Sequence, residues 1–235
     1  MSEKYTAVLF SAGLDSAVLA ADALARRARG ESVRAIYAAV GFAWEYEERA
    51  MAARLFAQAP FARAIDPLVE LQFDMRDVFP PTHWAVRGEP PAFDTPDADV
   101  YLHGRNAILL AKAAVYASAA ARGNPQNDGI RLLVGTLAGN PFPDARPDFL
   151  AAMSRALSLG LDARLTIQAP FSALHKADVI RRGIELGVPL ELTLSCMQPK
   201  DGLHCGRCSK CRERRDAFAE ARVEDPTRYR QRPLR

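Results

Sequence analysis

The four cysteines of the chain lie within sixteen residues near its C-terminus and are the strongest chemical signal in the sequence. They are Cys196, Cys205, Cys208 and Cys211, and the last two steps have C-x2-C spacing. Four thiolates match the tetrahedral preference of zinc, and such short steps let one loop surround a single ion. We therefore predict one zinc ion per chain, with free thiols or two disulfides as the alternative. A site with four protein ligands has no open position for water, so this metal should be structural.

A short loop of small residues near the N-terminus has the composition of an anion-binding loop. It follows the apolar run 7–10, precedes a helical pattern and reads Ser11-Ala12-Gly13-Leu14-Asp15-Ser16. Small residues let the backbone approach a ligand, and N–H groups at a helix start attract phosphate. The serine hydroxyls can donate to phosphate oxygens, and Asp15 would hold a bridging Mg2+ or cap the loop. An ordinary strand–turn–helix is the alternative, and the chain has neither a G-x-x-x-x-G-K-S/T nor a G-x-G-x-x-G motif.

This loop resembles the S-G-G-x-D-S pyrophosphate loop of ATP pyrophosphatases of the adenine-nucleotide alpha-hydrolase fold. Three further segments, in the same order, resemble the 7-cyano-7-deazaguanine synthases of the queuosine pathway. They are residues 102–106 (L-H-G-R-N), 142–149 (F-P-D-A-R-P-D-F) and 170–178 (P-F-S-A-L-H-K-A-D), the last followed by E-L-G-V-P at 185–189 and by Ser195-Cys196. The cysteine spacing is also that of the family, so the resemblance covers most of the chain.

The resemblance implies an ATP-dependent carbon–nitrogen ligase that uses 7-carboxy-7-deazaguanine and ammonia. ATP, with Mg2+, would adenylate the carboxylate, ammonia would displace AMP, and a second activation would dehydrate the amide to a nitrile. Such an enzyme needs positive charge against phosphates more than it needs an acid–base pair. We expect Arg105 and Lys176 to supply that charge, although both could be solvated helix residues. The expected nucleotide contacts are Ser11, Gly13, Leu14, Asp15, Ser16, Gly104, Arg105 and Asn106, with Asp15 also catalytic.

Asp144 and Arg146 are candidates for binding the second substrate. A carboxylate can accept from the N1–H and 2-amino edge of a guanine-like base, and an arginine can hold a carboxylate with two hydrogen bonds. Alternatively, Asp144 caps the helix that begins near Pro147. No histidine has an identifiable partner, so we expect each to be solvated or to cap a helix: His83, His103, His175 and His204.

Three departures from the family pattern leave another activity open. Ala12 replaces the first glycine of the loop, and its methyl group is tolerated where its φ is negative. The turn at 40–45 lacks the glutamine and histidine of the synthases, and Trp44 there could stack on a base or pack in the core. The 73–102 stretch matches no family segment and is a candidate lid. The alternative is therefore a paralogue that joins an adenylated carboxylate to another nucleophile, such as a protein amine.

The composition indicates a soluble globular protein: 49% of residues are hydrophobic and 25% are charged. No apolar run reaches membrane-spanning length, the N-terminus does not read as a signal peptide, and clustered cysteines favour the cytoplasm. Residues 200–235 carry 11 Lys/Arg against 6 Asp/Glu. This basic end admits a zinc-binding nucleic-acid-binding protein, but it has no interleaved aromatics, so direct nucleic-acid binding is not favoured. A tRNA sulfur-inserting enzyme would need a free reactive cysteine, and zinc would take all four. A non-catalytic homologue is a further alternative. The family resemblance implies a homodimer.

Alternating strand and helix patterns position these groups. Such alternation predicts an α/β fold, with a Rossmann-like parallel sheet covered by helices on both faces and active-site loops at the carboxyl ends of the strands. We divide the chain into an ATP-binding domain, 1–190, and a C-terminal zinc-binding segment with a terminal helix, 191–235. The expected strands are 7–10, 33–40, 131–135 and 164–168. The expected helices are 16–29, 46–58, 105–121, 147–159, 175–186 and 212–222.

Overall fold

Five parallel strands form one sheet in the order β3-β2-β1-β4-β5. The computed structural model describes residues 3–28, 31–122 and 127–232. The strands are β1 (Glu3–Leu9), β2 (Val33–Ala39), β3 (Val69–Gln72), β4 (Asn127–Leu133) and β5 (Leu165–Gln168). The predicted parallel sheet is confirmed. Strand β3 was not predicted, because it has only four residues at the sheet edge and none of them is fully buried.

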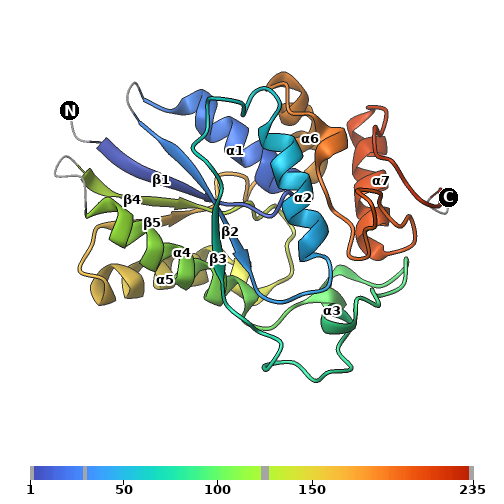
Figure 1. The fold of residues 1–235 in the computed structure, drawn as a ribbon, viewed down its shortest axis with the longest axis horizontal. Helices are drawn as coiled ribbons and strands as arrows, with labels where there is room; N and C mark the ends of the chain where they lie inside the picture. The colour runs from blue at the N-terminus through green and yellow to red at the C-terminus, as the bar shows by residue number, and fades with distance from the viewer. Residues whose placement is uncertain (1–2, 29–30, 123–126, 233–235) are drawn as a thin grey trace.

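Helices cover both faces of the sheet, as predicted (Figure 1). One core cluster joins the sheet to α1, α2 and α6, and the other joins it to α4 and α5. The helices are α1 (Leu14–Arg26), α2 (Glu45–Phe56), α3 (Trp84–Arg87), α4 (Arg105–Ala121), α5 (Pro147–Gly160), α6 (Lys176–Glu185) and α7 (Ser209–Ala221). Helix α7 begins three residues earlier than expected, since Cys208 is its N-cap residue, and β4 begins at Asn127 rather than 131. Among the described residues, none of the helices has the length and apolarity that a membrane span requires.

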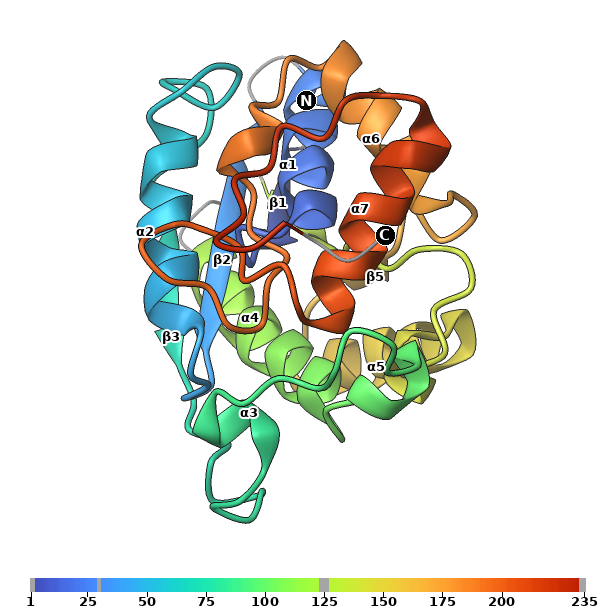
Figure 2. The same ribbon diagram turned by 90° about the vertical axis from the view of Figure 1, so that its right-hand side faces the viewer.

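The direction in which successive strands are added to the sheet reverses between β1 and β4. Strands β2 and β3 extend the sheet on one side of β1, and β4 and β5 extend it on the other. The loops after β1 and β4 therefore diverge, and the crevice between their carboxyl ends is where open α/β sheets bind ligands. Helix α7 lies beyond this end of the sheet, on the side opposite the start of β1 (Figure 1), and it is turned toward the viewer in Figure 2.

The C-terminal segment packs against the sheet domain rather than standing apart from it. The cysteines and Phe218 of α7 belong to the same core cluster as α1. The backbone N–H of Leu194 donates to the carbonyl of Ala12 at 2.8 Å, so the segment leading to the first cysteine is bonded to the predicted phosphate loop. The two predicted parts thus share one continuous core.

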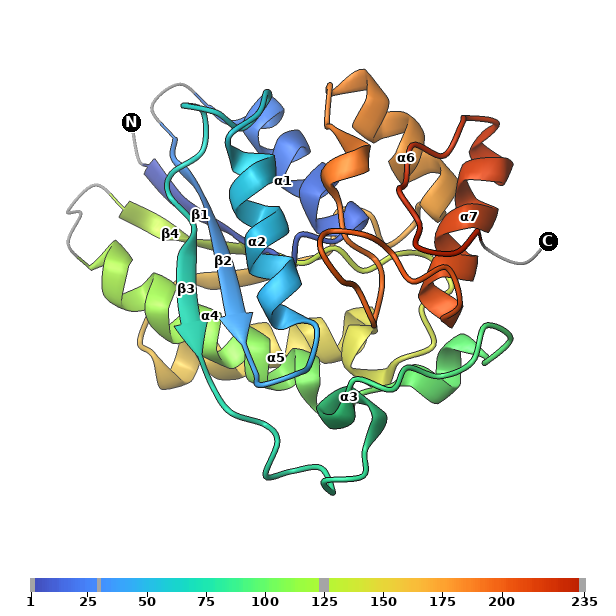
Figure 3. The same ribbon diagram turned by 45° about the vertical axis from the view of Figure 1, so that its right-hand side comes forward.

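The 73–102 segment is irregular, as expected, and is docked on the C-terminal segment. It leaves β3, carries α3 and one 3-10 turn (Asp97–Val100), and returns beside the start of α7 (Figure 3). Arg212 donates to the carbonyl of Thr95 at 3.0 Å, and Gln198 donates to the carbonyl of Gly88 at 3.0 Å. These contacts hold the segment across the carboxyl ends of the strands.

Candidate active site

A cavity of about 640 Å3 lies at the carboxyl ends of the strands. Its wall combines the loops after β1, β2 and β4, the first turns of α4 and α6, and one side of α7. Most of the predicted site residues line it: Ser11, Gly13, Leu14, Asp15, Arg105, Asn106, Asp144 and Lys176. Of the residues predicted to bind nucleotide or the second substrate, three are not part of the lining, namely Ser16, Gly104 and Arg146. The structure therefore brings together segments that are far apart in the sequence.

The loop after β1 closes on itself and opens α1. The backbone N–H of Ser11 donates to Oγ of Ser16 at 3.2 Å, and that hydroxyl donates to the carbonyl of Gly13 at 3.0 Å. Gly13 is the N-cap residue of α1 and has no side-chain cap, which leaves the helix start available to an anion. Gly135 of the β4 loop lies against this turn, since a Cβ there would be 3.4 Å from the backbone N of Ser16.

Ala12 has a φ of 55°, in the left-handed region, and is completely buried. The methyl group was expected to be tolerated at a negative φ, and this condition is not met. An L-residue in this region costs about 1–2 kcal/mol, which the family glycine would avoid. The loop conformation is therefore kept at a cost in strain.

A network of opposite charges crosses the cavity from the loop to α7. Lys176 Nζ lies 3.3 Å from Asp15 Oδ2 and also contacts a carboxylate oxygen of Glu213. Lys210 pairs with Glu213 at 2.6 Å and with Asp97 at 3.5 Å. The Lys176 side chain is only 17% exposed. Residues of the C-terminal segment thus take part in the ion network around the phosphate loop.

These charges set the protonation states of the network. Burial alone would lower the pKa of Lys176, but Asp15 and Glu213 outweigh it and raise that pKa. Burial would raise the pKa of Glu213, but Lys176 and Lys210 lower it to about 2. Burial raises the pKa of Asp15, and Lys176 opposes this rise only in part. At neutral pH, Lys176 is therefore a partly buried cation beside the predicted phosphate loop.

Asp144 caps a helix, but not the helix named by the alternative prediction. Its Oδ2 accepts from the backbone N–H of Asn106 at 3.0 Å, and its Oδ1 accepts from Nδ2 of Asn106 at 3.2 Å. It therefore caps the first turn of α4 rather than the helix at Pro147. Burial raises the pKa of Asp144, against the hydrogen bonds from Asn106.

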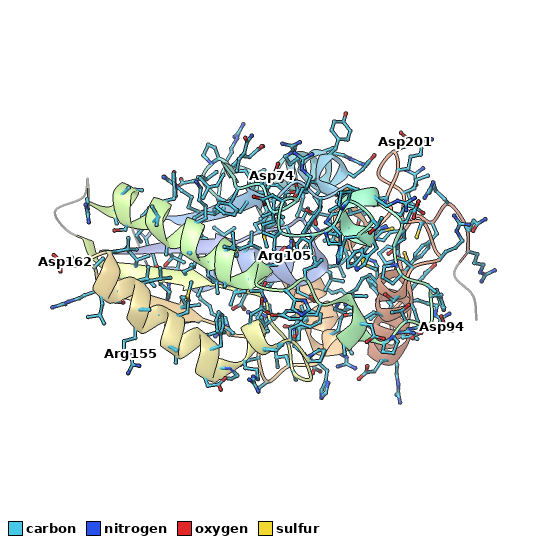
Figure 4. All side chains as sticks on the ribbon, turned by 90° about the horizontal axis from the view of Figure 1, so that it is seen from below. Asp74, Asp94, Arg105, Arg155, Asp162 and Asp201 are labelled. Atoms are coloured by element: carbon cyan, nitrogen blue, oxygen red, sulfur yellow. The ribbon has the colours of Figure 1, made fainter. Side chains whose placement is uncertain are left out.

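The two predicted arginines lie in different surroundings. Arg105 lines the cavity, and its Nε is buried with no hydrogen-bond partner among the described residues. Figure 4 shows Arg105 near the middle of the molecule, whereas Asp94, Arg155 and Asp162 lie at its periphery. The side chain of Arg146 is 63% exposed and lies 3.9 Å from Asp148. Arg105 thus has an unused donor at the cavity, and Arg146 faces solvent.

The wall formed by the β2 loop and α2 holds a residue that the sequence analysis missed. Glu48 is 8% exposed, lines the cavity and accepts from the hydroxyl of Tyr37 at 2.8 Å. Burial raises its pKa to about 7, although Arg105 and Tyr37 favour the charged form. Trp44 and Trp84 line the cavity beside it, with their rings stacked at 5.6 Å. The signal was present in the sequence, because Glu48 falls on the same helical face as Met51, Ala52 and Leu55.

The four cysteines meet in one buried cluster, as predicted. Their sulfur atoms all lie within 4.8 Å of one another. The measured Sγ–Sγ separations are 3.5 Å for Cys208–Cys211 and 3.9 Å for Cys205–Cys211. A tetrahedron with metal–sulfur bonds of about 2.3 Å has edges of about 3.8 Å. The cluster therefore has the size that one tetrahedral ion requires.

Backbone amides surround this cluster in the manner of a thiolate site. The N–H groups of Gln198 and Cys205 donate to the sulfur of Cys196 at 3.3 and 3.2 Å, and that of Arg207 donates to Cys205 at 3.3 Å. Such donors stabilise negative sulfur. Gly206 has a φ of 79°, and a Cβ there would lie 1.8 Å from the carbonyl oxygen of Gln231. The tight turn at Gly206 therefore leaves no room for a larger residue.

His204 and Arg214 fix the C-terminal segment from inside. His204 was expected to be solvated or to cap a helix, and this expectation is wrong. It is 2% exposed, and its Nε2 accepts from the backbone N–H of Ser195 at 3.1 Å. Burial, followed by the charge of Arg214, lowers the pKa of His204 to about 3. Arg214 is 1% exposed and donates to Thr193 Oγ1 and to the carbonyl of Leu190.

Comparisons with known proteins agree on one family. A family model described as queuosine biosynthesis protein QueC matches residues 6–222. A 7-cyano-7-deazaguanine synthase from Anaeromyxobacter dehalogenans is 34% identical over 231 residues, which cover 94% of each chain. One from Stutzerimonas stutzeri is 32% identical over 241 residues, covering 97% of this chain and 100% of the relative. One from Methanoculleus marisnigri is 41% identical over 133 residues, or 55% of this chain and 56% of the relative.

Two solved structures are more distantly similar. The U34-tRNA thiolase NcsA from Methanococcus maripaludis, with its 4Fe-4S cluster, is 11% identical with a TM-score of 0.47, covering 94% of this chain and 67% of the thiolase. A 4-thiouridine synthetase in an RNA complex with bound ATP is 13% identical with a TM-score of 0.44, covering 94% of this chain and 50% of the synthetase.

Proposed function

Because the chain belongs to the QueC family of queuosine biosynthesis proteins, we propose that it is an ATP-dependent 7-cyano-7-deazaguanine synthase. Its substrates are 7-carboxy-7-deazaguanine, ammonia and ATP. The observation that carries this proposal is the convergence of the phosphate loop, Lys176 and Arg105 on one cavity at the strand ends. Full-length relatives that bear the synthase name, at 32–34% identity, support the same activity.

The first half-reaction joins the substrate carboxylate to AMP. A carboxylate oxygen attacks the α-phosphorus of ATP, an oxygen–phosphorus bond forms, and pyrophosphate leaves. The free N–H groups at the start of α1 bind the departing pyrophosphate, and Lys176 neutralises its charge from the side of α6. Asp15 and Glu213 keep Lys176 protonated before ATP arrives. Removal of one such pre-organised charge costs about 100- to 1,000-fold in rate.

The second half-reaction forms the carbon–nitrogen bond. Ammonia attacks the acyl carbon, AMP departs with one of the two carboxylate oxygens, and a proton is released to give the amide. The amide oxygen then attacks the α-phosphorus of a second ATP, and pyrophosphate leaves. Loss of AMP, and of two protons from nitrogen, leaves the nitrile. Arg105, with its unpartnered Nε at the cavity, is placed to stabilise the negative charge that develops in these steps.

The residues present fit the two metals that this function involves. Asp15 Oδ1 is buried and has no hydrogen-bond partner among the described residues, so it can hold Mg2+ bound to the ATP phosphates. That Mg2+ would neutralise phosphate charge. The cysteine cluster has the size and the soft ligands for one Zn2+ ion, which would fix the C-terminal segment. All four cysteines are free thiols in the structure, and we propose a reducing cytoplasm as their compartment.

The test is product formation by the purified protein. Incubation with ATP, Mg2+, ammonium and 7-carboxy-7-deazaguanine should yield the nitrile, detected by mass spectrometry, together with AMP. Glu70→Gln changes an exposed carboxylate on β3 and should retain wild-type activity. If the wild-type protein, loaded with zinc and folded, forms neither amide nor nitrile, the proposed function is wrong.

A further inference from the structure

Two buried carboxylates, Glu48 and Asp144, line the same cavity as the phosphate loop. Both oxygens of Asp144 already accept hydrogen bonds from Asn106, and these bonds hold the first turn of α4. Use of Asp144 to bind a base would therefore compete with a helix cap. Glu48 is not used as a helix cap in this way. Its carboxylate accepts a hydrogen bond from the Tyr37 hydroxyl, and a carboxylate has about four lone pairs.

Aromatic rings stand beside Glu48. Trp44 and Trp84 stack on each other with an interplanar angle of 15°, and both contribute to the cavity wall. Arg105, on α4, places a positive charge near Glu48. Glu45, which lies on α2 together with Glu48, places a negative charge near it. A planar ligand in this corner would therefore find aromatic rings and a carboxylate acceptor on the same wall of the cavity.

We propose that Glu48 recognises the guanine-type edge of the second substrate, with the Trp44–Trp84 pair as its stacking platform. A carboxylate offers two acceptors side by side, and the N1–H and 2-amino groups of such a base offer two donors. An adenine edge offers one donor and one acceptor, so an ionised Glu48 discriminates against it. Base–aromatic stacking adds affinity without regard to base identity. This inference rests on the proposed function, and it moves base recognition from Asp144 to Glu48.

The site offers a direct optical probe of binding. The chain has two tryptophans, and both line the cavity, so all of its tryptophan fluorescence reports on this wall. Titration with 7-carboxy-7-deazaguanine, without ATP, should quench that fluorescence. A matched analogue that lacks the 2-amino group should bind the wild-type protein more weakly, because one hydrogen bond to a charged group is lost. Trp84→Phe should reduce the quenching amplitude.

Comparison of variants isolates the contact. Glu48→Gln should weaken binding of the full base by about 10- to 100-fold, the range for hydrogen bonds to a charged group, and should bring its affinity close to that of the analogue. Asp144→Asn should keep the wild-type preference for the 2-amino group. Glu70→Gln, which changes an exposed carboxylate on β3, serves as the control. Thermal melting of each variant establishes that it is folded.

Several outcomes would overturn the assignment. Glu48→Gln could keep the full wild-type preference, Asp144→Asn could abolish it, or Glu48→Gln could weaken ATP binding alone. The last outcome would place adenine in this corner. Failure of the proposed function gives a different result: the wild-type protein binds the base and distinguishes the analogue but forms no nitrile. A wild-type protein that forms nitrile while Glu48→Gln retains the 2-amino preference refutes only the recognition role.

Discussion

Replacement of Glu48 by Gln should change how the stability of the protein depends on pH. Burial raises the pKa of Glu48 from 4.5 to about 7, Glu45 adds to the rise, and Arg105 and Tyr37 oppose it. Between these two pH values the folded protein holds a proton that the unfolded chain releases. The free energy of unfolding therefore falls as pH rises through this window, and the loss is complete above about pH 7.

The size of the effect follows from the shift. One pKa unit corresponds to about 1.4 kcal/mol, so the rise from 4.5 to about 7 corresponds to a loss of about 3 kcal/mol. Gln keeps the shape and an acceptor for the Tyr37 hydroxyl but carries no charge at any pH. As the pH rises from 4.5 to about 7, the free energy of unfolding of Glu48→Gln should therefore rise by about 3 kcal/mol relative to that of the wild type. For a chain of this length, that is a difference in melting temperature of about 6–12 °C.

The assay is unfolding of both proteins, without ligands, at several pH values from 5 to 8. Every other titrating group is common to the pair, so the difference between them isolates Glu48. Glu70→Gln, which replaces a side chain that is 51% exposed, is unfolded alongside them as a folding control. A stability difference that does not vary with pH would refute the buried, proton-holding state of Glu48. If the wild type gained stability over Glu48→Gln from pH 5 to pH 8, the pKa shift of Glu48 on folding would have the opposite sign to the one described.

Three further substitutions test other parts of the structure. Cys208→Ser should lose the metal, measured by elemental analysis, and melt at least about 10 °C lower, since structural zinc contributes on the order of 10 kcal/mol to folding; a stable, metal-free, active variant would contradict this role. Lys176→Met should lower the rate of AMP formation about 100- to 1,000-fold, and near-wild-type turnover would remove Lys176 from the phosphate site. Ala12→Gly should stabilise the protein by about 0.5 kcal/mol. Relief of about 1–2 kcal/mol of backbone strain exceeds the loss of a buried methyl group, which is worth about 0.8 kcal/mol. Destabilisation by more than about 1 kcal/mol in a denaturant titration would show that Ala12 is not strained.

Local patterns in the sequence predicted the sheet, the long helices and the cysteine cluster. The α4 boundaries matched, because apolar spacing and the glycine before it define that helix locally. Strand β3 was missed because pairing with β2, and not its own composition, makes it a strand. The positive φ of Ala12 also depends on tertiary contact, in particular on the hydrogen bond from Leu194 to its carbonyl.

The candidate site was predicted only where a motif marks it. The predicted phosphate loop and Lys176 meet at the cavity, and Glu213 and Lys210 reach the same network only because the C-terminal segment folds back over the strand ends. Sequence spacing carries no information on that approach. The role of Asp144 was assigned without knowledge that Asn106 would occupy both of its oxygens. A homodimer and the absence of direct nucleic-acid binding stay predictions.

Transfer of substrate oxygen to AMP tests the central claim, adenylation of the carboxylate, most directly. The substrate 7-carboxy-7-deazaguanine is prepared with isotopically heavy oxygen in its carboxylate and incubated with the zinc-loaded protein, ATP, Mg2+ and ammonium. We predict that both heavy oxygens leave the substrate, one in each of two AMP molecules, as the nitrile forms. Nitrile formation with unlabelled AMP, or with ADP and labelled inorganic phosphate, would contradict attack at the α-phosphorus.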